Sequence, residues 1–87
     1  MGITINKRSS EIPDEIYQAV ADLGGRPEFE GDWHVSVLPA HDNDDWQLSL
    51  ASRWMRAPAI DLAPEHQSAT GVQRALHSML ESLEEES

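Results

Sequence analysis

The segment WHVSVLPAHDNDDWQLSL, residues 33–50, decides the fold because apolar and polar residues alternate at both of its ends. The apolar positions form two runs with a spacing of two: Trp33, Val35 and Val37, then Trp46, Leu48 and Leu50. This spacing places one side of a β-strand in a core and leaves the other side polar. Pro39 ends the first run, since proline donates no hydrogen bond to a sheet. We therefore predict two strands joined by an acidic connection, the second running on toward Trp54.

Apolar residues at helical spacing lie on either side of these two strands. Those on the N-terminal side are Ile12, Ile16, Val20 and Leu23. They predict a helix over residues 12–23, capped by Ser9 or Ser10. We expect Gly24–Gly25 to end this helix in the left-handed conformation. The stripe on the C-terminal side consists of Ala69, Val72, Leu76, Met79, Leu80 and Leu83. It predicts a second helix that is capped by Ser68.

Two shorter alternating runs complete the expected order of elements. Ile3–Ile5 is a weak signal for a first strand, and Ile60–Leu62 indicates a last one. The order is therefore (β)αβββα. We predict a small α+β domain of two layers, in which a three- to four-stranded antiparallel sheet carries both helices on one face. Residues 1–87 are expected to form this single domain, with flexible ends at 1–8 and 84–87.

The charge of the chain limits the class of partner. It has 87 residues, with 16 acidic side chains against 6 Lys and Arg, and a net charge of −10. Affinity for phosphate depends on Lys and Arg that displace counterions, so direct binding to DNA or RNA is not expected. A basic protein surface is the electrostatic complement of such a chain. A homodimer remains open.

The sequence contains no sign of export or membrane insertion. Cysteine is absent, which removes disulfides and thiolate metal sites. No apolar run reaches the roughly 18 residues of a membrane span. The first ten residues, MGITINKRSS, carry positive charge without the apolar stretch that follows it in a signal peptide. We expect a complete small protein of the cytoplasm.

No spacing of residues matches a metal, cofactor or catalytic motif. Read as a calcium loop from Asp42, the sequence puts Trp46 and Gln47 where a ligand and a glycine are needed. The four histidines include no pair at helical ligand spacing, and no phosphate-binding glycine loop or Gly-x-Ser-x-Gly is present. The sequence therefore predicts a protein that is not an enzyme and that needs no metal or cofactor.

The run Asp42-Asn43-Asp44-Asp45 has two interpretations that the sequence leaves open. Asp and Asn are favoured in turns because they bond their own backbone. Three acids in four residues, however, exceed what a turn requires and indicate a surface for a basic partner. The predicted partner-binding residues are Glu28, Glu30, Asp32, Asp42, Asp44, Asp45 and Trp46. An aromatic residue beside acids is typical of an interface. Whether Trp33, Trp46 and Trp54 lie in the core or at an interface stays open.

In size, acidity, absence of cysteine and simple α+β pattern, the chain resembles the small acidic proteins that phages use against host defence, the anti-CRISPR and anti-restriction inhibitors. Some members of that group present carboxylates in place of nucleic-acid phosphates. The resemblance implies a stoichiometric inhibitor that acts in the host cytoplasm and blocks a basic nucleic-acid channel. The residues that would mimic phosphates are the six acids named above. Arg53, Arg56 and Arg74 interrupt the acidic pattern.

Two hypotheses of function follow. The first is an acidic, non-enzymatic binding protein that inhibits a nucleic-acid-handling partner. The second is a protein interaction or assembly module without mimicry, such as an immunity protein, an antitoxin or a dimerising accessory factor. Salt distinguishes them, because attraction by clustered acids weakens with ionic strength and an apolar interface does not.

Overall fold

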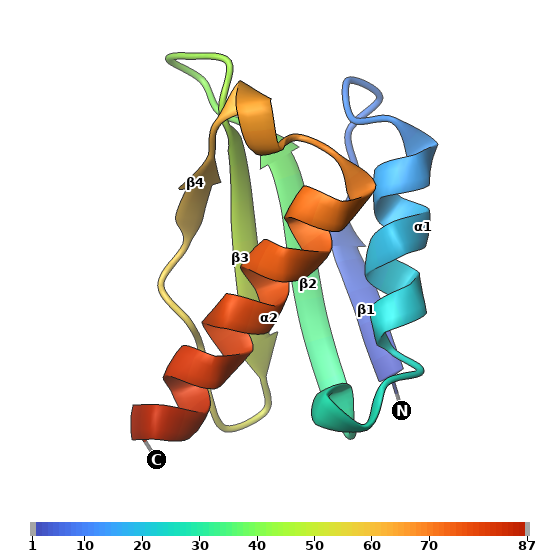
Figure 1. The fold of residues 1–87 in the computed structure, drawn as a ribbon, viewed down its shortest axis with the longest axis vertical. Helices are drawn as coiled ribbons and strands as arrows, with labels where there is room; N and C mark the ends of the chain where they lie inside the picture. Colours follow the sequence, from blue (N-terminus) through green and yellow to red (C-terminus); the bar gives the residue numbers. More distant parts are fainter. Residues whose placement is uncertain (1, 87) are drawn as a thin grey trace.

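One layer of the protein is a four-stranded sheet and the other is a pair of helices, in a computed structural model that describes residues 2–86 (Figure 1). The strands are β1 (Gly2–Lys7), β2 (Asp32–Pro39), β3 (Trp46–Ser52) and β4 (Ile60–Leu62). The helices are α1 (Asp14–Leu23) and α2 (Ala69–Glu86), with short 3₁₀ turns η1 (Pro27–Phe29) and η2 (Pro64–His66). The predicted α+β class and the order of elements are confirmed.

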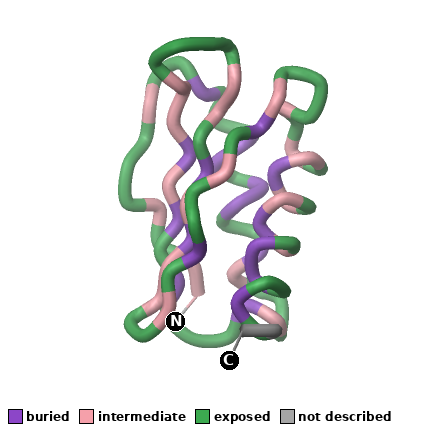
Figure 2. Tube along the Cα trace, turned by 90° about the vertical axis from the view of Figure 1, so that its left-hand side faces the viewer, coloured by how far each residue is buried: buried purple, intermediate pink, exposed green. Residues whose placement is uncertain are grey.

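The central hairpin consists of the two predicted alternating strands. β2 and β3 are antiparallel, with Val35 opposite Leu50 and Val37 opposite Leu48. All four side chains are fully buried, because the alternation turns them toward the helical layer. The second strand ends at Ser52 and does not reach Trp54. Figure 2 shows that the buried positions lie between the two layers and that the loops at both ends of the molecule are exposed.

The sheet is mixed, which corrects the expected antiparallel arrangement. β1 runs parallel to β2, with Ile3 beside Trp33 and Ile5 beside Val35. The connection from Lys7 to Asp32 contains α1, which returns the chain to the end of the sheet where β1 began. Gly2–Lys7, within the segment 1–8 that was expected to be flexible, forms strand β1, and Ile3 and Ile5 pack against the core. Met1 and Ser87, at the two expected flexible ends, lie outside the described residues.

The first helix begins differently from the prediction. It starts at Asp14, with Pro13 at the cap position and no side chain bonding the helix end. Ser9 instead accepts a hydrogen bond from the N–H of Glu11, 3.2 Å away, in the preceding turn. Tyr17 holds this turn against the sheet: its hydroxyl accepts from the N–H of Ser9 (2.7 Å) and donates to the carbonyl of Val37 (2.9 Å).

The second helix agrees with the prediction at its start. The hydroxyl of Ser68 accepts a hydrogen bond from the N–H of Gly71, 3.1 Å away. The residues of the apolar stripe that are buried are Val72, Leu76, Met79, Leu80 and Leu83. α2 therefore forms a large part of the core, beside the buried side of α1.

Two glycines allow close approach of backbone segments. The predicted left-handed exit of α1 is wrong, since Gly24 has a right-handed φ of −61°. A side chain there would meet the β1 backbone, because a Cβ would lie 3.0 Å from the nitrogen of Ile3. At Gly71 a Cβ would overlap the carbonyl oxygen of His66. This glycine permits η2 to pack on the first turn of α2.

Candidate functional site

The β2–β3 hairpin ends in the tip loop, residues 40–45, at one end of the sheet (Figure 1). Asp42 and Asp44 are exposed there, and Asp45 is half-buried. The structure therefore places three of the predicted partner-binding residues together on one protruding loop.

Neutral groups hold the tip loop in shape. The N–H of Ala40 donates to the carbonyl of Asp45 (2.9 Å), which closes the loop. The side chain of Asn43 accepts from the N–H of Asp45 (2.8 Å). From outside the loop, the amide of Gln67 donates to the carbonyls of Asp44 (2.6 Å) and Leu62 (3.1 Å). The turn thus depends on backbone groups and two uncharged amides.

The three aspartate carboxylates take no part in this support. Among residues 2–84, no hydrogen bond or ion pair is formed by the carboxylate of Asp42, Asp44 or Asp45. Like charges so close together repel one another, and each is stabilised by an approaching cation. The loop is therefore a fixed frame that presents uncompensated negative charge to solvent.

Trp46, the fourth predicted residue at this end, supports the loop and does not extend the acidic surface. It is half-buried, packs against the core, and pairs with Pro39 on β2 and Leu62 on β4. Trp33 is buried as well, with its ring edge-to-face against Phe29 at a centroid distance of 6.4 Å. Trp33 is therefore a core residue, and Trp46 packs against the core.

The other predicted residues, Glu28, Glu30 and Asp32, lie at the opposite end of the sheet (Figure 1). The eight-residue strand β2 separates them from the tip loop, and such a strand spans roughly 23 Å at about 3.3 Å per residue. The structure therefore does not combine the predicted acids into one surface. It forms two acidic ends.

The acids of this second end differ in their surroundings. Glu28 is partly buried and lies 3.9 Å from Arg26 and 4.0 Å from His77, which also bonds Glu81 at 2.9 Å. The pKa of Asp32 is held below its usual value by a hydrogen bond and positive charge from the chain's amino terminus, and by the charge of Arg53. The carboxylate of Glu30 is exposed and, within the described residues, forms no ion pair. Glu30 is therefore the acid of this end whose charge is least compensated.

Trp54, for which the sequence left core or interface open, lies outside the core. Its side chain is 85% exposed, the only large apolar one so exposed among residues 2–86, although the alternation had aligned it with Leu48 and Leu50. The reason is a turn at Ser52, whose hydroxyl accepts from the N–H groups of Trp54 (3.3 Å) and Met55 (3.1 Å). Serine directly after the alternating run is the signal that could have indicated this turn.

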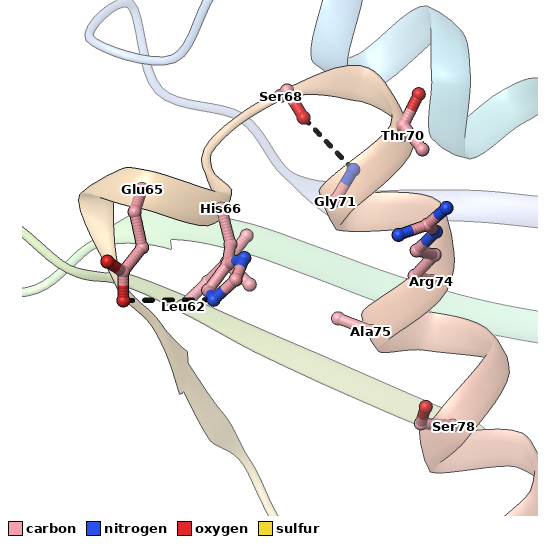
Figure 3. Close-up of a pocket in the computed structure, with 9 residues that line it drawn as sticks. All are labelled: Leu62, Glu65, His66, Ser68, Thr70, Gly71, Arg74, Ala75 and Ser78. Atoms are coloured by element: carbon pink, nitrogen blue, oxygen red, sulfur yellow. Dashed lines mark hydrogen bonds and ion pairs between the residues drawn. The ribbon is translucent and has the colours of Figure 1, made fainter.

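A surface groove with a volume of about 480 Å³ lies between η2 and α2. Figure 3 shows Ala75 of α2 on one side of it and Leu62 and His66 on the other. His66 and Glu65 form an exposed ion pair at 3.8 Å. Among the described residues, no hydroxyl in the groove bonds a histidine or a carboxylate, so the geometry assembles no nucleophile with its base.

The described residues contain neither a cluster of metal ligands nor a helix that could span a membrane. In the part of the chain that the structure describes, no three His, Asp or Glu side chains gather as a metal site would require. Neither helix, as far as Glu86, is both long enough and apolar enough to cross a membrane. Comparisons of the chain with family models, curated proteins and solved structures found no match.

Proposed function

We propose that this protein is a non-enzymatic acidic binding protein that inhibits a nucleic-acid-handling partner by occupying a basic surface with its tip loop. The proposal rests on one observation: the groups that hold the tip loop in shape are not the groups that carry its charge. Asn43 and Gln67 hold the turn, while the carboxylates of Asp42, Asp44 and Asp45 bond nothing within the described chain.

A loop of this kind favours fast and selective association with a basic partner. Complementary charge raises association rates by steering, and like charge rejects acidic partners. Because the loop is already ordered by hydrogen bonds, binding loses less conformational freedom than it would with a flexible acidic segment. The resemblance to small acidic phage anti-defence proteins supplies the class of partner, a complex with a basic nucleic-acid channel. The host cytoplasm is the corresponding location.

The proposal restricts which residues contact the partner first. Since the two acidic ends lie roughly 23 Å apart along β2, a single patch of basic residues meets one of them. The tip loop is the better candidate, because its carboxylates have no internal partner, whereas Glu28 and Asp32 are already near positive charge.

The experiment compares two variants that each remove three negative charges. The tip variant carries Asp42→Asn, Asp44→Asn and Asp45→Asn. The control carries Glu11→Gln, Glu15→Gln and Asp22→Asn, three exposed acids in α1 or just before it. Each is added to a panel of nuclease effector complexes, and inhibition of DNA cleavage is measured at about 50 and 500 mM salt.

We expect the tip variant to inhibit less at low salt than the control does, and the deficit to shrink at high salt, because screening already removes steering from the unmutated protein. Equal inhibition by the two variants would contradict a role for the tip loop. No inhibition of any complex by the unmutated protein would contradict the proposed class of partner.

A second function is favoured by the exposed ring of Trp54. An exposed aromatic residue at a loop is typical of a protein interface. It fits an interaction or assembly module such as an immunity protein, an antitoxin or a dimerising accessory factor. Binding that persists at high salt and depends on Trp54 alone would favour this alternative over charge-driven inhibition.

A further inference from the structure

Trp54 is held outward by the chain and is not merely left outside the core. The hydroxyl of Ser52 accepts hydrogen bonds from the N–H groups of Trp54 and Met55, and the N–H of Ser52 donates to the carbonyl of Met55 at 2.7 Å. This compact turn fixes the backbone that carries the ring. The exposure of so large an apolar surface costs free energy in water, which an occupant of the site would recover.

A hollow of about 310 Å³ lies beside the ring. Its apolar part comes from Trp33, Trp54 and Met55, and its charged part from Glu30, Asp32 and Arg53. Asp32 is already near positive charge, including that of Arg53. The carboxylate of Glu30 has no such partner among the described residues. The hollow therefore combines an aromatic wall with one uncompensated negative charge.

We propose that this hollow receives a lysine or arginine side chain of the basic partner. The aliphatic stem lies against Met55 and the face of Trp54, where a cation is also attracted by the aromatic ring. The charged end meets Glu30. The proposal rests on the proposed function for the class of partner, but it assigns a second contact at the end of the sheet opposite the tip loop.

A cationic side chain fits this hollow better than a second copy of the chain does. Each copy carries a net charge of −10, so two copies repel one another before any contact forms. An apolar side chain would cover Trp54 but would leave the carboxylate of Glu30 beside it without a partner. A lysine or arginine satisfies both groups at once.

The test uses a short peptide of alternating lysine and glycine as the probe, and the same peptide with norleucine in place of lysine as its control. Binding is followed by NMR at low salt, from the backbone amides of Ser52 and Met55 and, separately, from those of the tip loop. The variants are Trp54→Ala, Trp54→Phe and Glu30→Gln, with Asp61→Asn as a distant exposed control. Thermal melting of each variant checks that the fold is intact.

We expect the lysine peptide to shift the Ser52 and Met55 amides and the norleucine peptide not to. Trp54→Ala should weaken the affinity read at these amides by roughly five- to thirtyfold, since a cation on an aromatic face contributes about 1–2 kcal/mol. Trp54→Phe should retain most of the affinity. Glu30→Gln should cost roughly two- to fivefold, and Asp61→Asn should leave the affinity unchanged.

Equal shifts with both peptides, or unchanged affinity in Trp54→Ala, would overturn the assignment. So would self-association, measured by sedimentation, that is lost in Trp54→Ala while peptide binding stays the same. The two proposals fail separately. If the tip variant loses inhibition and the Trp54 variants bind peptide normally, the proposed function stands and the Trp54 site falls. The reverse result would retain the site and reject the role of the tip loop.

Discussion

Gln67→Ala tests whether a side chain outside the tip loop holds it in place. The amide of Gln67 reaches from the segment before α2 to the carbonyls of Asp44, at 2.6 Å, and Leu62, at 3.1 Å. A hydrogen bond contributes a net 0.5–1.5 kcal/mol, roughly, and one of these two is exposed, so the variant should lose about 1–2 kcal/mol of stability. In a domain of this size that loss lowers the melting temperature by about 4–16 °C.

The matched control is Gln47→Ala, an exposed glutamine on β3 whose side chain forms no hydrogen bond among the described residues. Thermal and urea unfolding of both variants, followed by circular dichroism, provide the comparison. We expect the control to stay within about 0.5 kcal/mol of the unmutated protein. If Gln67→Ala has the same melting temperature as the control, the side chain of Gln67 does not hold the tip loop in place.

Three further predictions concern the core, a close approach and metals. Leu76→Ala should cost about 2–5 kcal/mol in urea unfolding, because Leu76 is fully buried, whereas Ser78→Ala on the exposed side of α2 should cost little. Gly71→Ala should lower the melting temperature although alanine favours helices, since its Cβ would overlap the carbonyl of His66. Gly25→Ala, where the nearest contact would be an ordinary 3.7 Å, should not lower it. Chelator, calcium or zinc should leave the melting temperature unchanged within about a degree. An ion that binds the folded protein stabilises it by about 2.7 kcal/mol at a hundred times its dissociation constant. A clear rise in melting temperature with any ion would therefore contradict the prediction of a metal-free protein.

Local residue patterns predicted the helices and strands. The features that they did not predict depend on contacts between segments far apart in the sequence. The alternation around Val35 and Leu48 depends only on which side of a strand faces the core, so the buried side of each hairpin strand followed from the sequence. The direction of β1 depends on where α1 returns the chain, and no local pattern encodes that. The exit of α1 was wrong for a similar reason, because Gly24 is required by its approach to β1 and not by its own φ.

The sequence likewise predicted one part of the candidate site and not another. The tip loop was predicted as an acidic connection, and its three aspartates do lie together. The separation of Glu30 from that loop already follows from a strand between them, which holds its two ends apart. The exposure of Trp54 did not follow from the alternation, because Trp54 keeps the spacing of Leu48 and Leu50 although Ser52 interrupts the run, and the hydrogen bonds of the serine turn end the strand there.

At both ends of the sheet, neutral groups make the hydrogen bonds that order a loop, and carboxylates in or beside that loop carry negative charge. Asn43, Gln67 and Ser52 are neutral and make the hydrogen bonds, while Asp44 and Glu30 present carboxylates that no described side chain neutralises. A domain of 87 residues has a small margin of stability. If its recognition charges also held its turns, every change of partner preference would cost stability. Because neutral groups make these hydrogen bonds, the carboxylates can be exchanged at little cost to the fold. Under the proposed function, the partner would then set the pattern of charge at the two ends.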